Sequence, residues 1–368
     1  MQVVPGTGPD VGEPLVEESD YLCFTGSSKT GSLVASKAGE QLIDCSLELG
    51  GKNPAVVMPD ADIDAAVNGL VRGAFTNAGQ LCIAIERLYV HESVREEFTR
   101  KFVAATEALD IRPSDDWKVE MGSLLSQAQL DKVSSHVEDA RDAGATVLTG
   151  GEPLPDVGPY AYAPTVLTDV SGEADLARQE TFGPVVSIYG FEDTDEVIER
   201  ANDSMYGLNA SVWTADTERG RNIARRIDCG TANVNEAYAP SFIAHDAPMG
   251  GMKDSGVGRR HGEEGFYRFT EPQTLATQER GEIDSPPGVP YKWYASSVSS
   301  GSVVRAWRNI RVTLANSPIT ETKTGAFRRV TRRSSPTALS RSPSSRTCES
   351  APPRHGVASN CPSSPSAR

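Results

Sequence analysis

The residues of this chain that could do covalent chemistry begin with one cysteine in a glycine-containing turn. Cys82 lies in the stretch NAGQLCIAIER, with Gly79 and Gln80 just before it. A nucleophilic cysteine needs a lowered thiol pKa and an open approach, and a loop beside a helix end can provide both. A buried apolar cysteine is the more common alternative, so Cys82 alone does not identify a catalytic site.

A second candidate is the carboxylate of Glu48 in LELGGK, which lies in an apolar strand directly before two glycines. A charge in such a place is costly unless it has a partner or a use. Burial would raise the pKa of this carboxyl and suit it to act as a general base. An ion pair explains the residue equally well.

A third candidate is the stretch QETFGPVVS, residues 179–187. Glu180 could accept hydrogen bonds from sugar hydroxyls, and Phe182 could pack against a flat ring. The alternative is a simple connection from helix to strand that ends at Gly183 and Pro184.

Two glycine-containing stretches could bring the backbone close to a ligand. In FTGSSKTG, Gly26 and Gly31 flank a strand–turn–helix connection that would turn backbone N–H groups toward an anion. The stretch lacks the GxGxxG spacing, and glycines at strand ends are commonly only turns. In residues 247–266, the density of glycine predicts sharp turns or a close approach. A long irregular surface loop is the alternative for that segment.

The elements that must position these residues alternate between strand and helix. This alternation predicts an α/β architecture with a mainly parallel sheet. The expected strands are 21–24, 87–92, 145–151, 184–193 and 209–216, with two more around the Gly-Gly turn in 41–58. The expected helices are one ending at Gly39, one in 60–79, and those at 93–109, 127–144, 194–204 and 217–228.

Composition limits the class of protein. The 368 residues have room for two domains, and 38% are hydrophobic with a net charge of −14. We find no apolar run long enough to span a membrane and no signal peptide, so the expected location is the cytoplasm. An acidic protein body repels nucleic acid and membrane surfaces, so neither is an expected partner. The six cysteines are scattered without CxxC pairs or suitably spaced histidines, which predicts no disulfide framework and no metal site. Cys23 and Cys45 fall in expected strands, so we expect both to be buried.

The end of the chain differs from the rest. Residues 317–368 carry nine Lys and Arg against two Glu and are rich in Ser and Pro. Such a segment buries too little apolar surface to offset its ordering entropy, so we expect a disordered tail. An Arg-rich nucleic-acid tail and a changed reading frame are the alternatives.

Taken together and in order, FTGSSKTG, LELGGKNP, NAGQLC, QETFGPV and PMGGMKDSGVGR make the chain resemble the aldehyde dehydrogenase superfamily from about residue 3 to residue 278. The resemblance implies an α/β fold with a partial Rossmann-type cofactor domain and an α/β catalytic domain. It implies that the thiolate of Cys82 attacks the aldehyde and that Glu48 activates water to hydrolyse the thioester. It also implies NAD or NADP as cofactor, contacted by Gly26, Ser27, Leu49, Glu180 and Phe182.

Within the superfamily, NAGQLCIAIERLYV and PMGGMKDSGVGRRHG look most similar to the succinate-semialdehyde dehydrogenase branch. The implied substrate is therefore a small aldehyde that carries a carboxylate. The segment 235–247 would line the substrate entrance, and Ser241 is the candidate contact. A general aldehyde tunnel is the alternative. A homo-oligomer is expected if a full-length form exists.

The family resemblance predicts five segments. They are a remnant of the cofactor domain (1–48), the catalytic domain (49–240), the substrate loop with the glycine-rich segment and closing strand (241–280), an extension (281–316) and the tail (317–368). By this resemblance, we expect the sequence to start midway through the cofactor domain of the family. We therefore keep a second hypothesis, a truncated non-catalytic remnant that only associates with full-length subunits.

Overall fold

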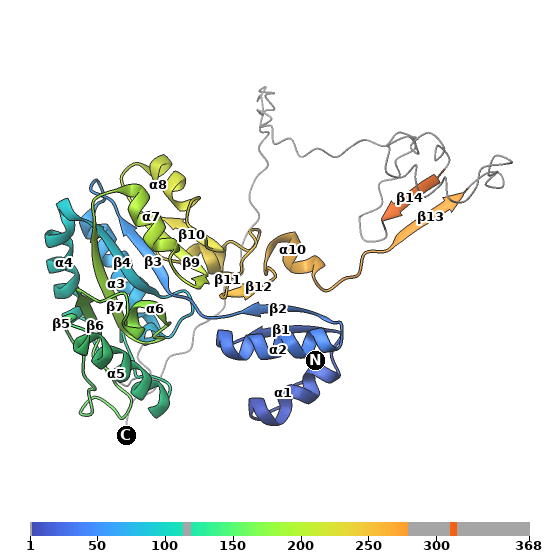
Figure 1. Ribbon diagram of the computed structural model, residues 1–368, viewed down its shortest axis with the longest axis horizontal. Helices are drawn as coiled ribbons and strands as arrows, with labels where there is room; N and C mark the ends of the chain where they lie inside the picture. The colour runs from blue at the N-terminus through green and yellow to red at the C-terminus, as the bar shows by residue number, and fades with distance from the viewer. Residues whose placement is uncertain (1, 113–118, 279–309, 315–368) are drawn as a thin grey trace, which may run out of the picture. The chain divides into compact units, whose positions relative to one another are not determined.

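A computed structural model describes residues 2–112, 119–278 and 310–314 of the chain. It divides into two units, Met1–Gln273 and Thr274–Arg368. The first contains the predicted site residues, and Figure 1 shows its elements.

The larger sheet of the first unit has seven strands in the order β10-β9-β3-β4-β7-β6-β5. All neighbouring pairs are parallel except β5 and β6, which are antiparallel. The expectation of a mainly parallel sheet is therefore confirmed. The strands are β3 (Asn53–Val57), β4 (Ile85–His91), β5 (Thr146–Thr149), β6 (Thr165–Thr168), β7 (Val185–Phe191), β9 (Asn209–Trp213) and β10 (Thr231–Val234).

Helices cover both faces of this sheet (Figure 1). Side chains alternate along β3, so Ala55 and Val57 join one hydrophobic cluster and Val56 joins the other. The first cluster includes α3 (Ile63–Phe75), α4 (Glu92–Glu107) and α5 (Gln127–Asp142). The second includes α7 (Thr194–Asn202) and α8 (Thr217–Ala224).

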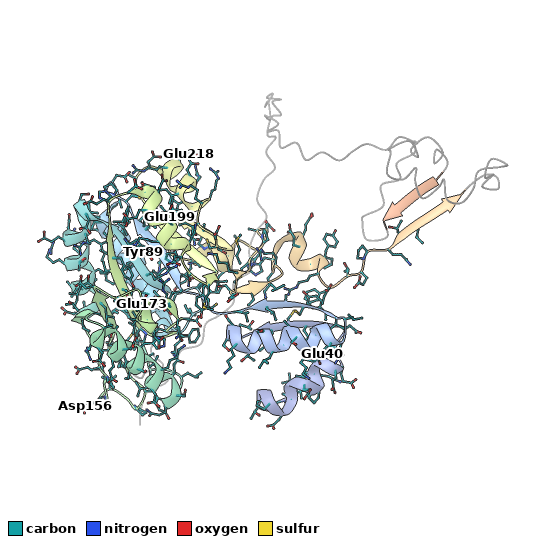
Figure 2. The ribbon with its side chains drawn as sticks, viewed as in Figure 1. Glu40, Tyr89, Asp156, Glu173, Glu199 and Glu218 are labelled. Atoms are coloured by element: carbon teal, nitrogen blue, oxygen red, sulfur yellow. The ribbon has the colours of Figure 1, made fainter. Side chains whose placement is uncertain are left out.

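Tyr89 of β4, labelled in Figure 2, shows how the second face is closed. Its ring stacks on Tyr189 of β7 with centroids 5.3 Å apart. The guanidinium carbon of Arg200, from α7, lies 5.1 Å from the Tyr89 centroid. A cation over an aromatic face adds attraction to the apolar contact, so helix and sheet are held by both.

A smaller sheet of three strands lies in the order β1-β2-β12. β1 (Tyr21–Thr25) and β2 (Asp44–Glu48) are parallel and joined through α2 (Ser28–Glu40). β12 (Gly256–Val257) comes from the glycine-rich segment and pairs antiparallel with β2. A Cβ on Gly256 would collide with the carbonyl oxygen of Leu47, so the predicted close approach of this segment is confirmed.

Short elements complete the first unit. They are α1 (Gly8–Glu17), the 3₁₀ turn η1 (Thr76–Gly79), α6 (Asp175–Arg178), α9 (Ala239–Ile243), α10 (Gly262–Tyr267) and the pair β8 (Tyr206–Gly207) and β11 (Met252–Lys253). No helix of the described residues has the length and apolar character needed to cross a membrane.

The second unit contributes one described feature, an antiparallel pair of β13 (Thr274–Gln278) and β14 (Ile310–Leu314). β13 coincides with the end of the predicted closing strand. Of the predicted extension 281–316, only 310–314 are described, and the predicted tail 317–368, with Cys348 and Cys361, lies outside the described residues.

One expectation about the cysteines is wrong. We expect Cys23 and Cys45 to be buried because both fall in strands, but Cys23 is exposed and Cys45 is half-buried. The physical reason is that their strands belong to the small sheet. Only the end of β2, from Ser46 to Glu48, is fully buried there.

Candidate active site

The turn before Cys82 has an unusual backbone. Asn77, Ala78 and Gly79 have φ values of 55°, 53° and 69°, all in the left-handed region. A Cβ on Gly79 would also collide with the carbonyl oxygen of Gly183, so glycine is required there. Outside the turn, the side chain of Gln80 accepts a hydrogen bond from Leu125 N at 2.8 Å. The backbone just before Cys82 is thus fixed by the close approach of Gly79 to Gly183 and by the hydrogen bond between Gln80 and Leu125.

The Gly50–Gly51 turn approaches the other side of Cys82. A Cβ on Gly51 would collide with the carbonyl oxygen of Cys82, so this contact exists only because residue 51 is glycine. Asn53 Nδ2 donates to the carbonyl oxygens of Cys82 at 2.9 Å and Ala84 at 2.7 Å. These contacts fix the backbone of Cys82 against the turn that follows Glu48.

Glu48 is the last residue of β2 and is 4% exposed. Its Oε1 lies 3.4 Å from Nε of Arg260, while its Oε2 is buried and has no hydrogen-bond partner among the described residues. Burial raises the pKa of this carboxyl, and the positive charges of Arg260, Arg259 and Arg268 oppose that shift. Both expectations for Glu48, a raised pKa and an ion pair, are confirmed together.

Glu180 lies between α6 and β7 and reaches over the same glycine turn. Its Oε1 accepts a hydrogen bond from Gly51 N at 2.9 Å. A Cβ on Gly50 would lie 2.6 Å from its Oε2, so the carboxylate rests against the bare backbone of the turn. Burial, and then the negative charge of Glu86, raise the pKa of Glu180 to about 7.

The thiol of Cys82 is half-buried beside these two carboxylates. Burial raises its pKa to about 11, and the negative charges of Glu180 and Glu48 act in the same direction. The backbone N–H groups of Cys82 and Ile83 act in the opposite direction. The structure therefore brings a thiol, two carboxyl groups and backbone donors to one place, from segments far apart in the sequence.

The other predicted cofactor residues lie around the small sheet. Gly26 and Ser27 form the exposed connection from β1 to α2, where Ser27 caps the helix by accepting from Thr30 N. The first turn of this 13-residue helix contains no acidic residue. Leu49 is buried, and its side chain fills the space over Gly31 of the same helix.

The remaining two predicted site residues are Phe182 and Ser241. Phe182 is half-buried with a φ of 54°, two residues after Glu180. Ser241 lies in α9, and its contact with a substrate stays a prediction. Within the described residues, no group of three or more His, Cys, Asp or Glu side chains is arranged to hold a metal ion.

The sequence reasoning missed three polar residues of this region: Lys52, Glu86 and Arg260. Lys52 and Glu86 form a buried ion pair, and Arg260 faces Glu48. A signal for Glu86 was present, because it is a carboxylate inside the apolar stretch IAIERLYV. The argument applied to Glu48, that such a charge needs a partner or a use, applies equally to Glu86.

Comparisons with known proteins bear on the family and the fold. A family model described as "Aldehyde dehydrogenase family" matches residues 1–275. A Mycobacterium tuberculosis protein named "Putative succinate-semialdehyde dehydrogenase", with NADP(+) in its name, is 53% identical over 288 residues. That match covers 78% of this chain and 56% of the relative, so the chain spans little more than half the relative's length.

Solved structures are similar as well. An NAD-dependent aldehyde dehydrogenase from Sinorhizobium meliloti has a TM-score of 0.70 and 35% identity, covering 73% of this chain and 53% of that one. A betaine aldehyde dehydrogenase from Staphylococcus aureus, in complex with NAD+, has a TM-score of 0.68 and 34% identity, covering 72% and 53%. The predicted α/β fold is thus confirmed.

Proposed function

Because the chain belongs to the aldehyde dehydrogenase family, we propose that it oxidises an aldehyde to the carboxylic acid with NAD or NADP, and that the aldehyde is succinate semialdehyde. The observation that supports this most strongly is the meeting of Cys82, Glu48 and Glu180 around the Gly50–Gly51 turn. The charges of both carboxyl groups act on the one thiol. The roles below are part of the proposal.

Cys82 is the nucleophile. Its thiol loses its proton to solvent, the thiolate forms a bond to the aldehyde carbon, and the carbonyl electron pair moves to oxygen to give the oxyanion of a thiohemiacetal. In this proposal the backbone N–H of Cys82 donates to that oxygen. When the thiohemiacetal loses a hydride, a thioester remains on Cys82.

Glu48 is the general base for the second half. It removes a proton from water as the water oxygen attacks the thioester carbon, and the acid leaves as the C–S bond breaks. Its buried Oε2, which has no hydrogen-bond partner in the part of the chain that the structure describes, accepts that proton in this proposal. Since burial raises the pKa of Glu48, the carboxylate is a stronger base than an exposed glutamate.

The residues of the small sheet fit a nicotinamide dinucleotide. The exposed start of α2, without acidic side chains in its first turn, suits a phosphate group. Glu180, half-buried and held by Gly51 N, has one carboxylate oxygen left to accept from a ribose hydroxyl. When bound, NAD or NADP supplies the acceptor for the hydride.

The substrate part of the proposal rests on relatives. The 53% identical Mycobacterium tuberculosis protein is named for succinate semialdehyde and NADP(+), whereas the betaine aldehyde dehydrogenase structure is 34% identical. The higher identity favours the semialdehyde and NADP. In this proposal, Ser241 of α9 contacts the substrate carboxylate.

A purified sample of this chain tests the function. We expect succinate semialdehyde to cause formation of reduced nicotinamide, faster with NADP than with NAD, and Cys82→Ala to abolish it. Glu48→Gln should leave one burst of reduced nicotinamide per chain and then stop, because hydrolysis of the thioester fails. Glu218→Gln, at an exposed position of α8, is the control variant and should keep the wild-type activity.

A different result would favour the second hypothesis. If no aldehyde produces reduced nicotinamide while Cys82 is still alkylated by iodoacetamide, the hypothesis of a truncated, non-catalytic remnant is supported. Co-purification with a full-length relative would then test whether it associates with such subunits.

A further inference from the structure

Lys52 and Glu86 are two of the buried charged residues, among those that the structure describes, that the proposed mechanism leaves unused. Lys52 follows the Gly50–Gly51 turn and Glu86 lies in β4, and their side chains are only 2% and 3% exposed. Lys52 Nζ lies 2.5 Å from Glu86 Oε2. Moving two charges out of water costs more than their attraction returns unless further hydrogen bonds complete the pair.

Those further hydrogen bonds all involve the segment Glu180–Phe182, and most are made by its backbone. Thr181 N donates to Oε1 and Oε2 of Glu86 at 3.1 and 3.0 Å, and Phe182 N donates to Oε1 at 3.0 Å. Lys52 Nζ also donates to Thr181 Oγ1 at 3.3 Å. One carboxylate therefore accepts from two successive backbone amides and from the ammonium group.

Helix α5 holds the same segment through its carbonyl groups. Gln129 Nε2 donates to Thr181 O at 3.0 Å and to Phe182 O at 2.8 Å. His136 Nδ1 lies 3.3 Å from Thr181 Oγ1, and burial lowers the pKa of this histidine to about 4, so it is neutral near pH 7. Side chains from three separate elements thus complete the hydrogen bonds of residues 181 and 182.

The segment needs such support because its backbone is strained. Phe182 has a φ of 54°, in the left-handed region that a bulky side chain rarely adopts. Such a conformation persists only where the surrounding structure determines it from several directions. Glu180, which reaches over the Gly50–Gly51 turn, directly precedes the two amides that Glu86 binds.

We propose that the buried Lys52–Glu86 ion pair is a positioning pair, which binds the amides of Thr181 and Phe182 and thereby fixes Glu180 where a cofactor ribose must meet it. Neither residue touches the reacting atoms in this proposal. The structural part, fixation of the segment, stands on the contacts above, and the part that concerns the cofactor rests on the proposed function.

Two variants distinguish a positioning role of the Lys52–Glu86 pair from a role in packing alone. Glu86→Gln leaves one acceptor oxygen for three donors and removes the counter-charge of Lys52, so the change is severe. The double variant Lys52→Met/Glu86→Gln removes both charges at similar volume and is expected to fold. Ile223→Ala, in the cluster on the other sheet face, is the control for a general loss of stability.

Amide hydrogen exchange tests the structural part without cofactor. In both variants, we expect the amides of Thr181 and Phe182 to exchange about tenfold faster or more, with the amides of β3 unchanged. Ile223→Ala should produce no such local difference. The proposal would be overturned if the amides of Thr181 and Phe182 exchanged at the wild-type rate in the double variant. It would also be overturned if the exchange rates of β3 and of these two amides rose equally.

Cofactor affinity tests the functional part. The double variant should weaken NADP binding about tenfold or more in calorimetric titration. In a Glu180→Gln background, the same double change should add little, because the pair acts through Glu180. Fully additive losses contradict positioning through Glu180. If the wild-type chain binds no cofactor, the proposed function fails, and hydrogen exchange still decides whether the pair holds the segment.

Discussion

At the scale of single residues, the surroundings of the Cys82 thiol disfavour its ionisation in this structure. Burial is the largest cause of its raised pKa, and Glu180 and Glu48 add to it. A thiolate is the reactive form, so the resting thiol is expected to be slow toward electrophiles. This environment is a property of the fold and could not be read from the GQLC motif.

The first prediction concerns alkylation of Cys82. With a pKa of about 11, the rate of modification by iodoacetamide should rise throughout the range from pH 7 to pH 10. Glu180→Gln should raise the rate at pH 8 about threefold or more, since a negative charge near the thiol is lost. Site-specific mass spectrometry measures the rate at Cys82.

The pH dependence of that effect provides a sharper test. The pKa of Glu180 is about 7, so its negative charge is present above pH 7 and largely absent at pH 5. The difference between wild type and Glu180→Gln should therefore shrink as the pH falls. Glu218→Gln, on the exposed surface of α8 (Figure 2), should match the wild type at every pH. An effect of Glu180→Gln that is equal at pH 5 and pH 8 would contradict the charge argument.

The second prediction concerns Glu48 and Arg260. The folded-state pKa of Glu48 is raised, so the stability it contributes is present below its unfolded pKa and is lost as pH rises through the folded value. Arg260 opposes that loss by stabilising the charged form. Arg260→Gln should thus cost more free energy of unfolding at pH 8 than at pH 4, which lies below the ordinary value of 4.5 from which the pKa of Glu48 is raised, by about 1–3 kcal/mol. Urea denaturation at the two pH values measures the difference.

The control for this prediction is the same change in a Glu48→Gln background, where the pH dependence should disappear. Arg259 and Arg268 also act on Glu48, so some attraction remains after Arg260 is removed. An equal loss at both pH values would mean that Arg260 contributes only through its hydrogen bonds to Phe24 O and Thr25 Oγ1.

At the scale of elements, the left-handed turn of Asn77, Ala78 and Gly79 decides where Cys82 lies. It links the end of α3 to β4, which follows Cys82 closely. Gly79, the third residue, has a positive φ. In addition, the carbonyl oxygen of Gly183 lies where a Cβ on residue 79 would be. The turn and the segment before β7 therefore approach each other only because residue 79 is glycine.

The third prediction follows from this approach. Gly79→Ala should lower the free energy of unfolding by about 2–4 kcal/mol, because it adds both backbone strain and a clash. Gly158→Ala is the matched control, since a Cβ there meets nothing within 4 Å. It should change stability by about 0.5 kcal/mol or less. Similar losses for the two variants in urea denaturation would argue against the strained turn.

The alternation of helices and strands in the large sheet was predicted well from sequence, whereas several strands were missed. Two strands of the large sheet, β6 and β10, were not expected, and neither were β8, β11, β12 and β14. β10 and β12 are four and two residues long, and β12 comes from a segment dense in glycine. Such segments have too few residues to show a period of two, and they become strands only because a neighbouring strand supplies hydrogen bonds.

At the scale of the molecule, the large sheet separates two hydrophobic clusters. One lies with α3, α4 and α5, and the other with α7 and α8. Because side chains point alternately to the two faces, a change in one cluster leaves the contacts of the other intact. The two faces are therefore expected to contribute independently to stability.

The fourth prediction tests this independence. Phe102→Leu on α4 and Ile223→Val on α8 lie on opposite faces, so their losses of about 1 kcal/mol each should add to within about 0.5 kcal/mol. Phe98 and Phe102 have stacked rings 5.5 Å apart, so Phe98→Leu combined with Phe102→Leu should deviate from additivity by more. Urea denaturation of the single and double variants decides, and equal coupling in both pairs would contradict the layered core.

The sequence by itself determined the order of most elements and the choice of candidate site residues, because hydrophobic periodicity and the motifs around Cys82, Glu48 and Glu180 are local properties of the chain. Only the tertiary structure decided their environments. Glu48 meets Arg260 across 212 positions, and Glu86 binds the amide of Thr181 across 95. Burial and charge depend on these distant partners, so the raised pKa of Cys82 and the Lys52–Glu86 pair emerged only when the chain was folded.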